Sequence, residues 1–290
     1  MAGSASGNST AAAGGQEPGT QTFAFIAMTC LFFFWGFITV LNDILIPFLK
    51  ESFDLNYTQA MLVQFCFFGA YFIVSPFAGK LIDKVGYQQG IVLGLLTTAT
   101  GCVLFYPSAS LNVYALFLFS FFVLASGITI LQVAANPYVA VLGSEDGASS
   151  RLNLSQAFNS FGTSIAPILG ASFILSDKVK SKEEIASLGQ VAKDAYLTAE
   201  ATAVQSPFII VTIMILLLAL VFMRVRLPQM LSDVPKGGYS ILLKKKSLLL
   251  GALGIFIYVG AEVSIGSYLV NYFYDMKLTS VIKESSVLSS

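Results

Sequence analysis

The sequence predicts an all-α integral membrane protein, a bundle of seven transmembrane helices. Two observations lead to this class. Fifty-six per cent of the 290 residues are apolar and only 11% are charged, whereas soluble domains carry about 25% charged residues. The apolar residues also lie in runs of about 20 or more, the length that crosses a hydrocarbon layer of roughly 30 Å as a helix. A water-soluble fold of this size cannot bury so much apolar surface, so lipid must cover part of it.

Each apolar run is expected to form one helix. Several runs are longer than a straight span requires, so tilted or kinked helices are expected. Proline removes a backbone donor and allows a local bend, and Pro47, Pro76, Pro137 and Pro167 lie in or at the ends of these runs. In chain order, the seven runs cover residues 23–48, 58–82, 87–107, 112–140, 151–176, 205–226 and 247–273.

The segments outside the runs divide the chain. Residues 1–22 are rich in Gly, Ala, Ser and Thr and are expected to be a disordered tail, and residues 274–290 form a second tail. Residues 227–246 are expected to be a cytoplasmic linker between a six-helix bundle (residues 23–226) and the seventh helix (residues 247–273), the start of a second bundle. Lys and Arg concentrate in the loops that are cytoplasmic when the amino terminus is inside, so we predict that orientation.

The composition excludes several function classes. The chain has no histidine, which excludes histidine triads, imidazole metal sites and histidine proton relays. Cys30, Cys66 and Cys102 lie inside apolar runs, so reduced buried thiols are favoured over a disulfide framework or a zinc site. No phosphate-binding loop of the G-x-x-x-x-G-K-[ST] type occurs, and the zero net charge gives no nucleic-acid footprint. We therefore expect neither an enzyme nor a bound cofactor.

Two carboxylates, Asp43 and Glu262, are the only charges far from the ends of the spans. A carboxylate near the bilayer centre costs at least about 2.5–3.5 kcal/mol, and such groups usually face a cavity or one another. One interpretation is a proton or sodium site that drives transport; the other is a protonated structural acid between helices. The transport interpretation is favoured for Asp43, which lies beside Asn42 and near Pro47. Both interpretations stay open for Glu262, because flanking glycines allow a close helix contact.

Uncharged polar residues recur at helical spacing in the first, second, fourth and fifth spans. No Lys or Arg lies deep in any span, so a neutral polar substrate is favoured. Amides donate and accept hydrogen bonds, which suits a hydroxyl-rich ligand, and an aromatic ring suits the C–H face of a sugar. Hydrogen bonding between helices, worth about 0.6 kcal/mol per bond, is the alternative. The residues are Trp35, Thr39, Asn42 and Asp43; Gln64, Tyr71 and Ser75; Thr129, Gln132 and Asn136; and Asn153, Gln156, Asn159, Ser160 and Thr163.

Several motifs resemble one family of transporters. The segment GKLIDKVG, with Gly79, Asp83, Lys84 and Gly86, lies between the second and third spans. It resembles the cytoplasmic loop motif of the major facilitator superfamily, G-x-x-x-D-[RK]-x-G, and is expected to take part in gating. Further segments are similar to the fucose permease branch of that superfamily, in particular to bacterial glucose/galactose transporters; they cover residues 32–49, 130–143, 151–167 and 258–273.

The resemblance implies a sugar symporter in the bacterial inner membrane, which imports a neutral hexose of the glucose or galactose type with a proton or a sodium ion. It implies Asp43 as the acid linked to protonation, and Gln156 and Asn159 as sugar contacts. A second family acid falls at Gln132, which cannot titrate, so Gln132 is expected to bind sugar. Glu262 would then supply the missing carboxylate.

Within this interpretation, the remaining sugar contacts are expected to be Trp35, Asn42 and Asn136. The resemblance also implies a major facilitator-type bundle of about twelve spans in two halves. Relative to twelve, seven spans are incomplete, so we expect a truncated chain or one that needs a partner carboxy-terminal half. Two alternatives stay open at this point: a seven-span sugar sensor without transport, and an inactive fragment.

Overall fold

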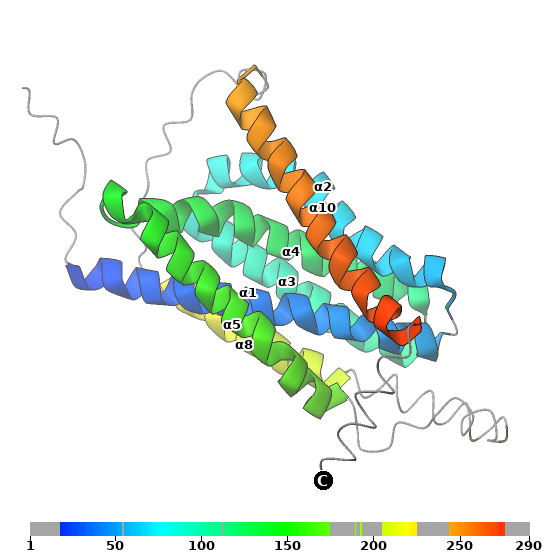
Figure 1. Cartoon of the computed structure of the whole chain (residues 1–290). Helices are drawn as coiled ribbons and strands as arrows, with labels where there is room; N and C mark the ends of the chain where they lie inside the picture. The colour runs from blue at the N-terminus through cyan, green and yellow to red at the C-terminus, as the bar shows by residue number, and fades with distance from the viewer. Residues whose placement is uncertain are drawn as a thin grey trace, which may run out of the picture. The chain divides into compact units, whose positions relative to one another are not determined.

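The computed structural model describes residues 18–53, 55–111, 113–174, 189, 192, 205–224 and 244–275. Over these residues the chain forms seven long α-helices and a short 3-10 helix, with no β-strand (Figure 1). It divides into two compact units, Met1–Ser232 and Asp233–Ser290, and the division falls within residues 227–246. The second unit contributes only its long helix to the described residues, and each unit is considered by itself.

Each of the seven predicted runs corresponds to one helix, which confirms the all-α class. The helices are α1 (Pro18–Ser52), α2 (Tyr57–Val85), α3 (Tyr87–Leu111), α4 (Tyr114–Val141), α5 (Ala148–Ile174), α8 (Gln205–Arg224) and α10 (Lys246–Asp275), with η1 (Glu145–Gly147) between α4 and α5. The largest difference is at the start, because α1 begins at Pro18 inside the predicted tail. Proline suits a first helical turn, where its missing N–H is not needed. Residues 1–17, 225–243 and 276–290 lie outside the described residues.

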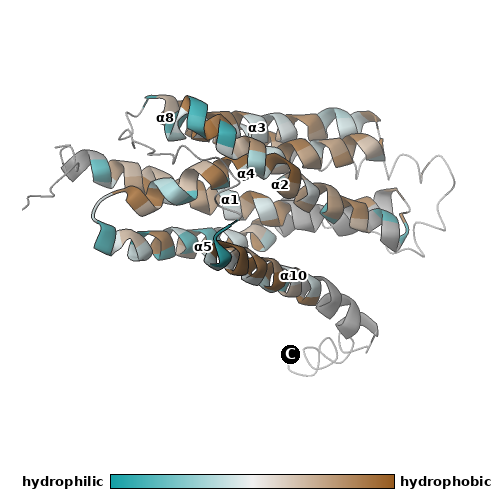
Figure 2. Ribbon diagram, turned by 90° about the horizontal axis from the view of Figure 1, so that it is seen from above, coloured by the Kyte–Doolittle hydropathy of each residue, from teal (hydrophilic) through white to brown (hydrophobic). Residues whose placement is uncertain are grey.

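Five of the described helices contain a segment long and apolar enough to cross a membrane. The segments are Gln21–Leu41, Met61–Val85, Tyr87–Leu111, Tyr114–Val141 and Lys246–Ile265. The described apolar part of α8 is shorter, Phe208–Arg224. Within the residues of α5 whose side chains the structure describes (148–169), amide and hydroxyl side chains interrupt the apolar residues, and this part is not among the five segments (Figure 2).

The two ends of α2 are set by local hydrogen bonds. At its start, the Gln59 backbone N–H donates to Asn56 Oδ1 (2.8 Å) and the Asn56 N–H donates to Gln59 Oε1 (3.0 Å), a reciprocal cap. At its end, the Gly86 N–H donates to the Ile82 carbonyl (2.7 Å), and Gly86 has φ +83°. Glycine adopts that backbone conformation without strain.

This geometry corrects the expected loop. Residues 79–85 of GKLIDKVG form the last turns of α2, and Gly86 alone separates α2 from α3. Asp83 and Lys84 are exposed, and Gly79 is half-buried. The motif is therefore a tight helical hairpin, and its gating role stays a prediction.

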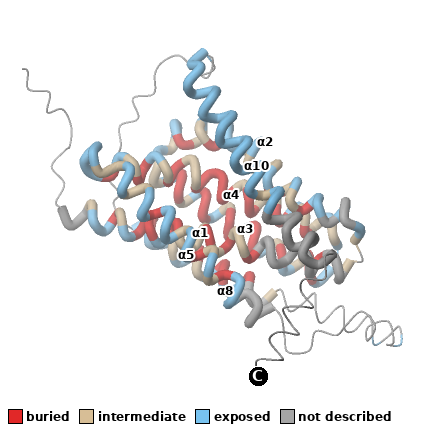
Figure 3. The backbone as a smooth tube through the Cα atoms, in the orientation of Figure 1, coloured by how far each residue is buried: buried red, intermediate tan, exposed pale blue. Residues whose placement is uncertain are grey.

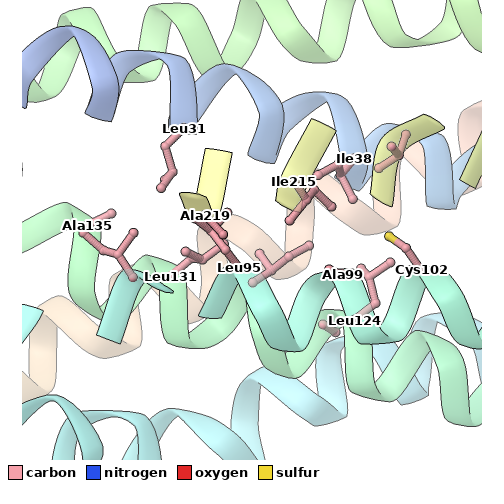
Figure 4. Packing of buried hydrophobic residues seen from close by; sticks show 14 of the residues in the cluster. Leu31, Ile38, Leu95, Ala99, Cys102, Leu124, Leu131, Ala135, Ile215 and Ala219 are labelled. Carbon is pink, nitrogen blue, oxygen red and sulfur yellow. The ribbon is translucent and has the colours of Figure 1, made fainter. Parts of the chain in front are cut away.

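The first unit is built around α3 and α4. Helix α3 packs against α4 and α8, α4 packs also against α2, and α1 packs against α5. The α3–α4 contact is close: a Cβ on Gly101 would lie 2.5 Å from the Leu124 backbone nitrogen, and one on Gly94 would lie 2.8 Å from Leu131 Cγ. Small residues at such crossings let backbones approach. Figure 3 shows most of the buried residues along these helices, and Figure 4 shows their apolar side chains meeting those of α1 and α8.

Two glutamines join α3 to α8 at opposite ends. Gln88 Nε2 donates to the Phe222 carbonyl (2.8 Å), one of the last carbonyls of α8, which have no partner inside their own helix. Gln205 Nε2 donates to Ser110 Oγ (2.9 Å) near the end of α3. These bonds fix the register of the antiparallel pair.

Candidate functional site

The contact between α1 and α5 brings two helices of the predicted site together. A Cβ on Gly36 would overlap the Asn159 carbonyl, and a Cβ on Gly162 would overlap the Phe33 carbonyl. Asn159 Nδ2 donates to the Phe32 carbonyl (2.9 Å), so part of its amide bonding capacity holds α5 on α1. The sugar contact predicted for Asn159 would have to use the rest of that amide.

Helix α5 presents three different faces. At about 3.6 residues per turn, its buried residues Ser155, Gly162 and Ala166 lie on one side. A second face is exposed and apolar, as expected for contact with lipid: Leu154, Phe158, Phe161, Ile168 and Leu169. The third face is exposed and polar: Asn153, Gln156, Ser160 and Ser164. The predicted sugar contact Gln156 therefore lies on an exposed polar face, with Asn159 and Thr163 half-buried nearer the contact with α1.

The predicted sugar contact on α4 is joined to α2. Gln132 Nε2 donates to the Tyr71 hydroxyl at 3.2 Å, and both side chains are half-buried. The Tyr71 ring lies 5.4 Å from that of Phe67. Asn136, one turn further along α4, is also half-buried. An amide beside a phenol and aromatic rings can bind a hydroxyl group and the C–H face of a sugar ring.

Thr129 lies on the same side of α4 as Gln132 and Asn136, as the spacing predicts, but it differs from them in burial. It is buried, and its hydroxyl donates to the Ala125 carbonyl of its own helix (2.7 Å). A threonine can satisfy its hydroxyl in this way inside an apolar contact. Thr129 is therefore part of the core.

The predicted residues of α1 are described in part. Trp35 is half-buried, with its ring 5.4 Å from that of Phe32, and Thr39 Oγ1 donates to the Trp35 carbonyl (2.9 Å). Asn42 and Asp43 lie within α1, but their side chains are outside the described part of the structure. The role of Asp43 in ion coupling stays a prediction.

Glu262 lies on α10 and is exposed. It belongs to the second unit, so its pairing with Asp43 stays a prediction as well. Among the residues that the structure describes, no group of three or more His, Cys, Asp or Glu side chains forms a metal site.

Sequence reasoning missed three structural roles. Arg151 is one of the basic residues near the predicted cytoplasmic ends of the spans, and its guanidinium hydrogen-bonds to backbone carbonyls of α4 and of the turn after it. The glycines of the α1–α5 contact carried a signal, since Gly36 and Gly162 interrupt long apolar and polar runs. The cap of α2 was also visible in the sequence, because Asn56 lies three residues before Gln59, the spacing of a capping box.

The sequence model of the Major Facilitator Superfamily matches residues 24–289, most of the chain. The chain belongs to the Major Facilitator Superfamily. This confirms the resemblance drawn from GKLIDKVG and the neighbouring motifs. It also establishes the chain as part of a multi-pass membrane family of transporters rather than of enzymes.

Two of the relatives are named for sugars. The chain is 54% identical over 258 residues to the glucose/galactose transporter of Brucella abortus biovar 1 (strain 9-941), covering 87% of this chain and 59% of the relative. It is 38% identical over 257 residues to the L-fucose-proton symporter of Escherichia coli (strain K12), covering 86% of this chain and 59% of the relative.

A solved structure shares the fold. FucP, a Major Facilitator Superfamily transporter in the outward conformation, matches with a TM-score of 0.77 and 37% identity, covering 87% of this chain and 63% of FucP. The chain thus spans about three fifths of the length of the relatives that it matches.

Proposed function

We propose that the chain takes part in cation-driven import of a neutral hexose, of the glucose or galactose type, across the bacterial inner membrane, with its amino terminus in the cytoplasm. The observation that carries the proposal is the exposed polar face of α5, with Asn153, Gln156 and Ser160, beside an apolar face of the same helix. The names of the Brucella and Escherichia relatives, a glucose/galactose transporter and an L-fucose-proton symporter, support a sugar as the substrate.

The argument from α5 is physical. Polar groups that face hydrocarbon without partners are costly, so polar residues in membrane helices usually face protein or a water-filled cavity. The lipid-facing side of α5 is already supplied by residues such as Phe158 and Phe161. The polar face is therefore expected to border the sugar pathway, where amides and hydroxyls replace the water that surrounds a sugar in solution.

The proposed mechanism uses a cation to control sugar occupancy. A proton or a sodium ion at Asp43, with or without Glu262, neutralises the carboxylate and allows the helices to close around the sugar. Gln132, Asn136, Gln156 and the part of the Asn159 amide that is not bonded to Phe32 hold the sugar by hydrogen bonds. Trp35 stacks on the C–H face of the sugar. The proposal requires no cofactor beyond the coupling ion. Alternating access requires two halves that move around a central site, so the remaining helices of such an assembly belong to the proposal.

The test is accumulation of radiolabelled galactose by cells that lack their own hexose uptake and express the chain together with the carboxy-terminal helices that alternating access requires. Wild-type cells are expected to concentrate galactose, and to lose that ability either when sodium is replaced or when the proton gradient is collapsed. Asp43→Asn is expected to abolish accumulation but to preserve counterflow, the exchange of galactose without an ion gradient. Unchanged accumulation by Asp43→Asn would contradict the coupling role. Sugar binding without any accumulation by the wild type would support the sensor alternative.

A further inference from the structure

The connection between α4 and α5 has an unusual polar link. After α4 ends at Val141, the chain turns through Gly143, which has φ +104°, and through η1 before α5 begins at Ala148. Arg151 lies in the first turn of α5, and its guanidinium reaches back to the end of α4. The last carbonyls of a helix have no partner inside it, and a cation near them interacts favourably with the helix dipole.

Two nitrogens of the Arg151 guanidinium, Nε and Nη2, make three hydrogen bonds. Nε donates to the Val139 carbonyl (3.1 Å), and Nη2 donates to the carbonyls of Ala140 (2.7 Å) and Ser144 (2.9 Å). Val139 and Ala140 belong to the last turn of α4, and Ser144 belongs to the turn. Since the guanidinium is planar and rigid, three bonds from two of its nitrogens fix its orientation as well as its position.

The other side of the guanidinium lies against two glycines. A Cβ would lie 3.1 Å from Arg151 Nη1 at Gly143 and 2.6 Å from it at Gly147. A side chain at Gly147 would therefore displace the guanidinium, and one at Gly143 would also strain the backbone. The turn thus leaves a space beside Gly143 and Gly147 that the guanidinium of Arg151 fills.

The contact of Arg151 with the end of α4 is important because the two helices that it joins, α4 and α5, pack mainly against different helices. Helix α5 packs mainly on α1, whereas α4 packs mainly on α3 and α2. Gln132 and Asn136 lie before the Arg151 contact on α4, and Gln156 and Asn159 lie after Arg151 on α5. At about 1.5 Å per residue, Asn136 is roughly 5 Å along α4 from Val139, and Asn159 roughly 12 Å along α5 from Arg151.

We propose that Arg151 is a positioning residue, which locks the end of α4 to the start of α5 and so sets the spacing of the two amide pairs that bind the sugar. The consequence for sugar binding rests on the proposed function. The lock itself does not, because it is a property of the turn.

The first experiment measures the lock without any sugar. Spin labels at the exposed positions Val141 and Leu154, in a chain whose native cysteines are replaced by alanine, report the distance between α4 and α5 in nanodiscs. The wild-type chain is expected to give a narrow distribution of distances between the two labels. The distribution for Arg151→Gln is expected to be at least about twice as wide. Arg151→Lys keeps the positive charge but loses the planar guanidinium, so it is expected to give a distribution of intermediate width. Gly147→Ala keeps Arg151 but places a methyl group where the guanidinium lies, so it is also expected to widen the distance distribution. This variant tests the contact if Arg151→Gln does not fold.

The matched control is Arg224→Gln, an exposed arginine at the end of α8, which is expected to leave the distribution unchanged. If the distance distributions of Arg151→Gln and Gly147→Ala are as narrow as that of the wild type, Arg151 does not hold α4 to α5.

The second experiment measures galactose affinity through the fluorescence of Trp35, the single tryptophan of the chain. Arg151→Gln is expected to lower the affinity about 10-fold, Arg151→Lys less, and Arg224→Gln not at all. Wild-type affinity in Arg151→Gln would overturn the positioning role. Absence of any saturable response in the wild type would instead contradict the proposed sugar function, and would leave the spin-label result to decide the lock.

Discussion

At the scale of single residues, three buried serines of the first unit differ in how their hydroxyls are satisfied. The Ser108 and Ser120 hydroxyl oxygens lie 3.0 Å apart between α3 and α4, and each is also within hydrogen-bond distance of a carbonyl of its own helix. Since each hydroxyl has one proton, one serine donates to the other and the other donates to its own helix, so that both hydroxyls are satisfied. Ser155, fully buried on α5, has no hydrogen-bond partner for its hydroxyl among the described residues. A buried polar group without a partner costs free energy that an apolar group of similar size does not.

Ser155→Ala is therefore expected to raise the free energy of unfolding by up to about 1 kcal/mol, because it removes an unsatisfied hydroxyl. The matched change Ser120→Ala breaks the bond to Ser108 and is expected to lower it by about 1 kcal/mol. Reversible unfolding in mixed detergent micelles measures both. A loss of stability in Ser155→Ala as large as that in Ser120→Ala would show that the Ser155 hydroxyl is in fact satisfied.

The sequence indicated which polar residues share a helix face, but not which of them contact another helix. Spacing grouped Thr129 with Gln132 and Asn136, and yet the Thr129 hydroxyl bonds to its own helix while the Gln132 amide reaches Tyr71. The difference depends on the side chain's length and on how near the next helix lies. Periodicity within one helix carries no information about either.

At the scale of helices, glycines decide how closely α1 and α5 approach. Gly36 is buried at the crossing, where a Cβ would overlap the backbone of Asn159. Backbone atoms cannot move aside as a flexible side chain can, so the helices would have to separate. Separation would also stretch the bond from Asn159 to the Phe32 carbonyl.

Gly36→Ala is expected to lower the free energy of unfolding by about 1–3 kcal/mol, the range for overpacking a close contact. Gly69→Ala is the control, since a Cβ there meets nothing within 4 Å. That change is expected to be neutral or to stabilise α2 by up to about 1 kcal/mol through helix propensity. The same unfolding assay compares them, and equal effects of the two changes would contradict the close crossing.

Hydropathy predicted where the helices lie, because the length of an apolar run is fixed by the thickness of the bilayer. It did not predict which helices pack together. Helices in lipid are apolar on every side, and their contacts depend on small residues and on single hydrogen bonds. The pairing of α3 with α8 through Gln88 and Gln205 is one such case. The turn held by Arg151 is another.

At the scale of the whole molecule, the described residues give one part of the proposed sugar site. The first unit contains the amides of α4 and α5 and the aromatic residues of α1 and α2. Asp43 and Glu262, chosen from the sequence as rare charges inside apolar runs, belong to different units, so the ion-coupling part of the site rests on the sequence. Family membership follows from local motifs, whereas the geometry between two bundles requires both bundles.

Transport by this chain depends, in the proposed mechanism, on binding of a neutral hexose at the polar face of α5. Equilibrium binding of radiolabelled galactose to the purified chain in nanodiscs tests it most directly, with Gln156→Ala on the polar face and Leu154→Ala on the apolar face as a matched pair. The wild type and Leu154→Ala are expected to show the same saturable binding, and Gln156→Ala about 10-fold weaker binding, equivalent to a loss of about 1.4 kcal/mol. Equal binding by Gln156→Ala and Leu154→Ala, or no saturable binding by the wild type, would contradict the claim.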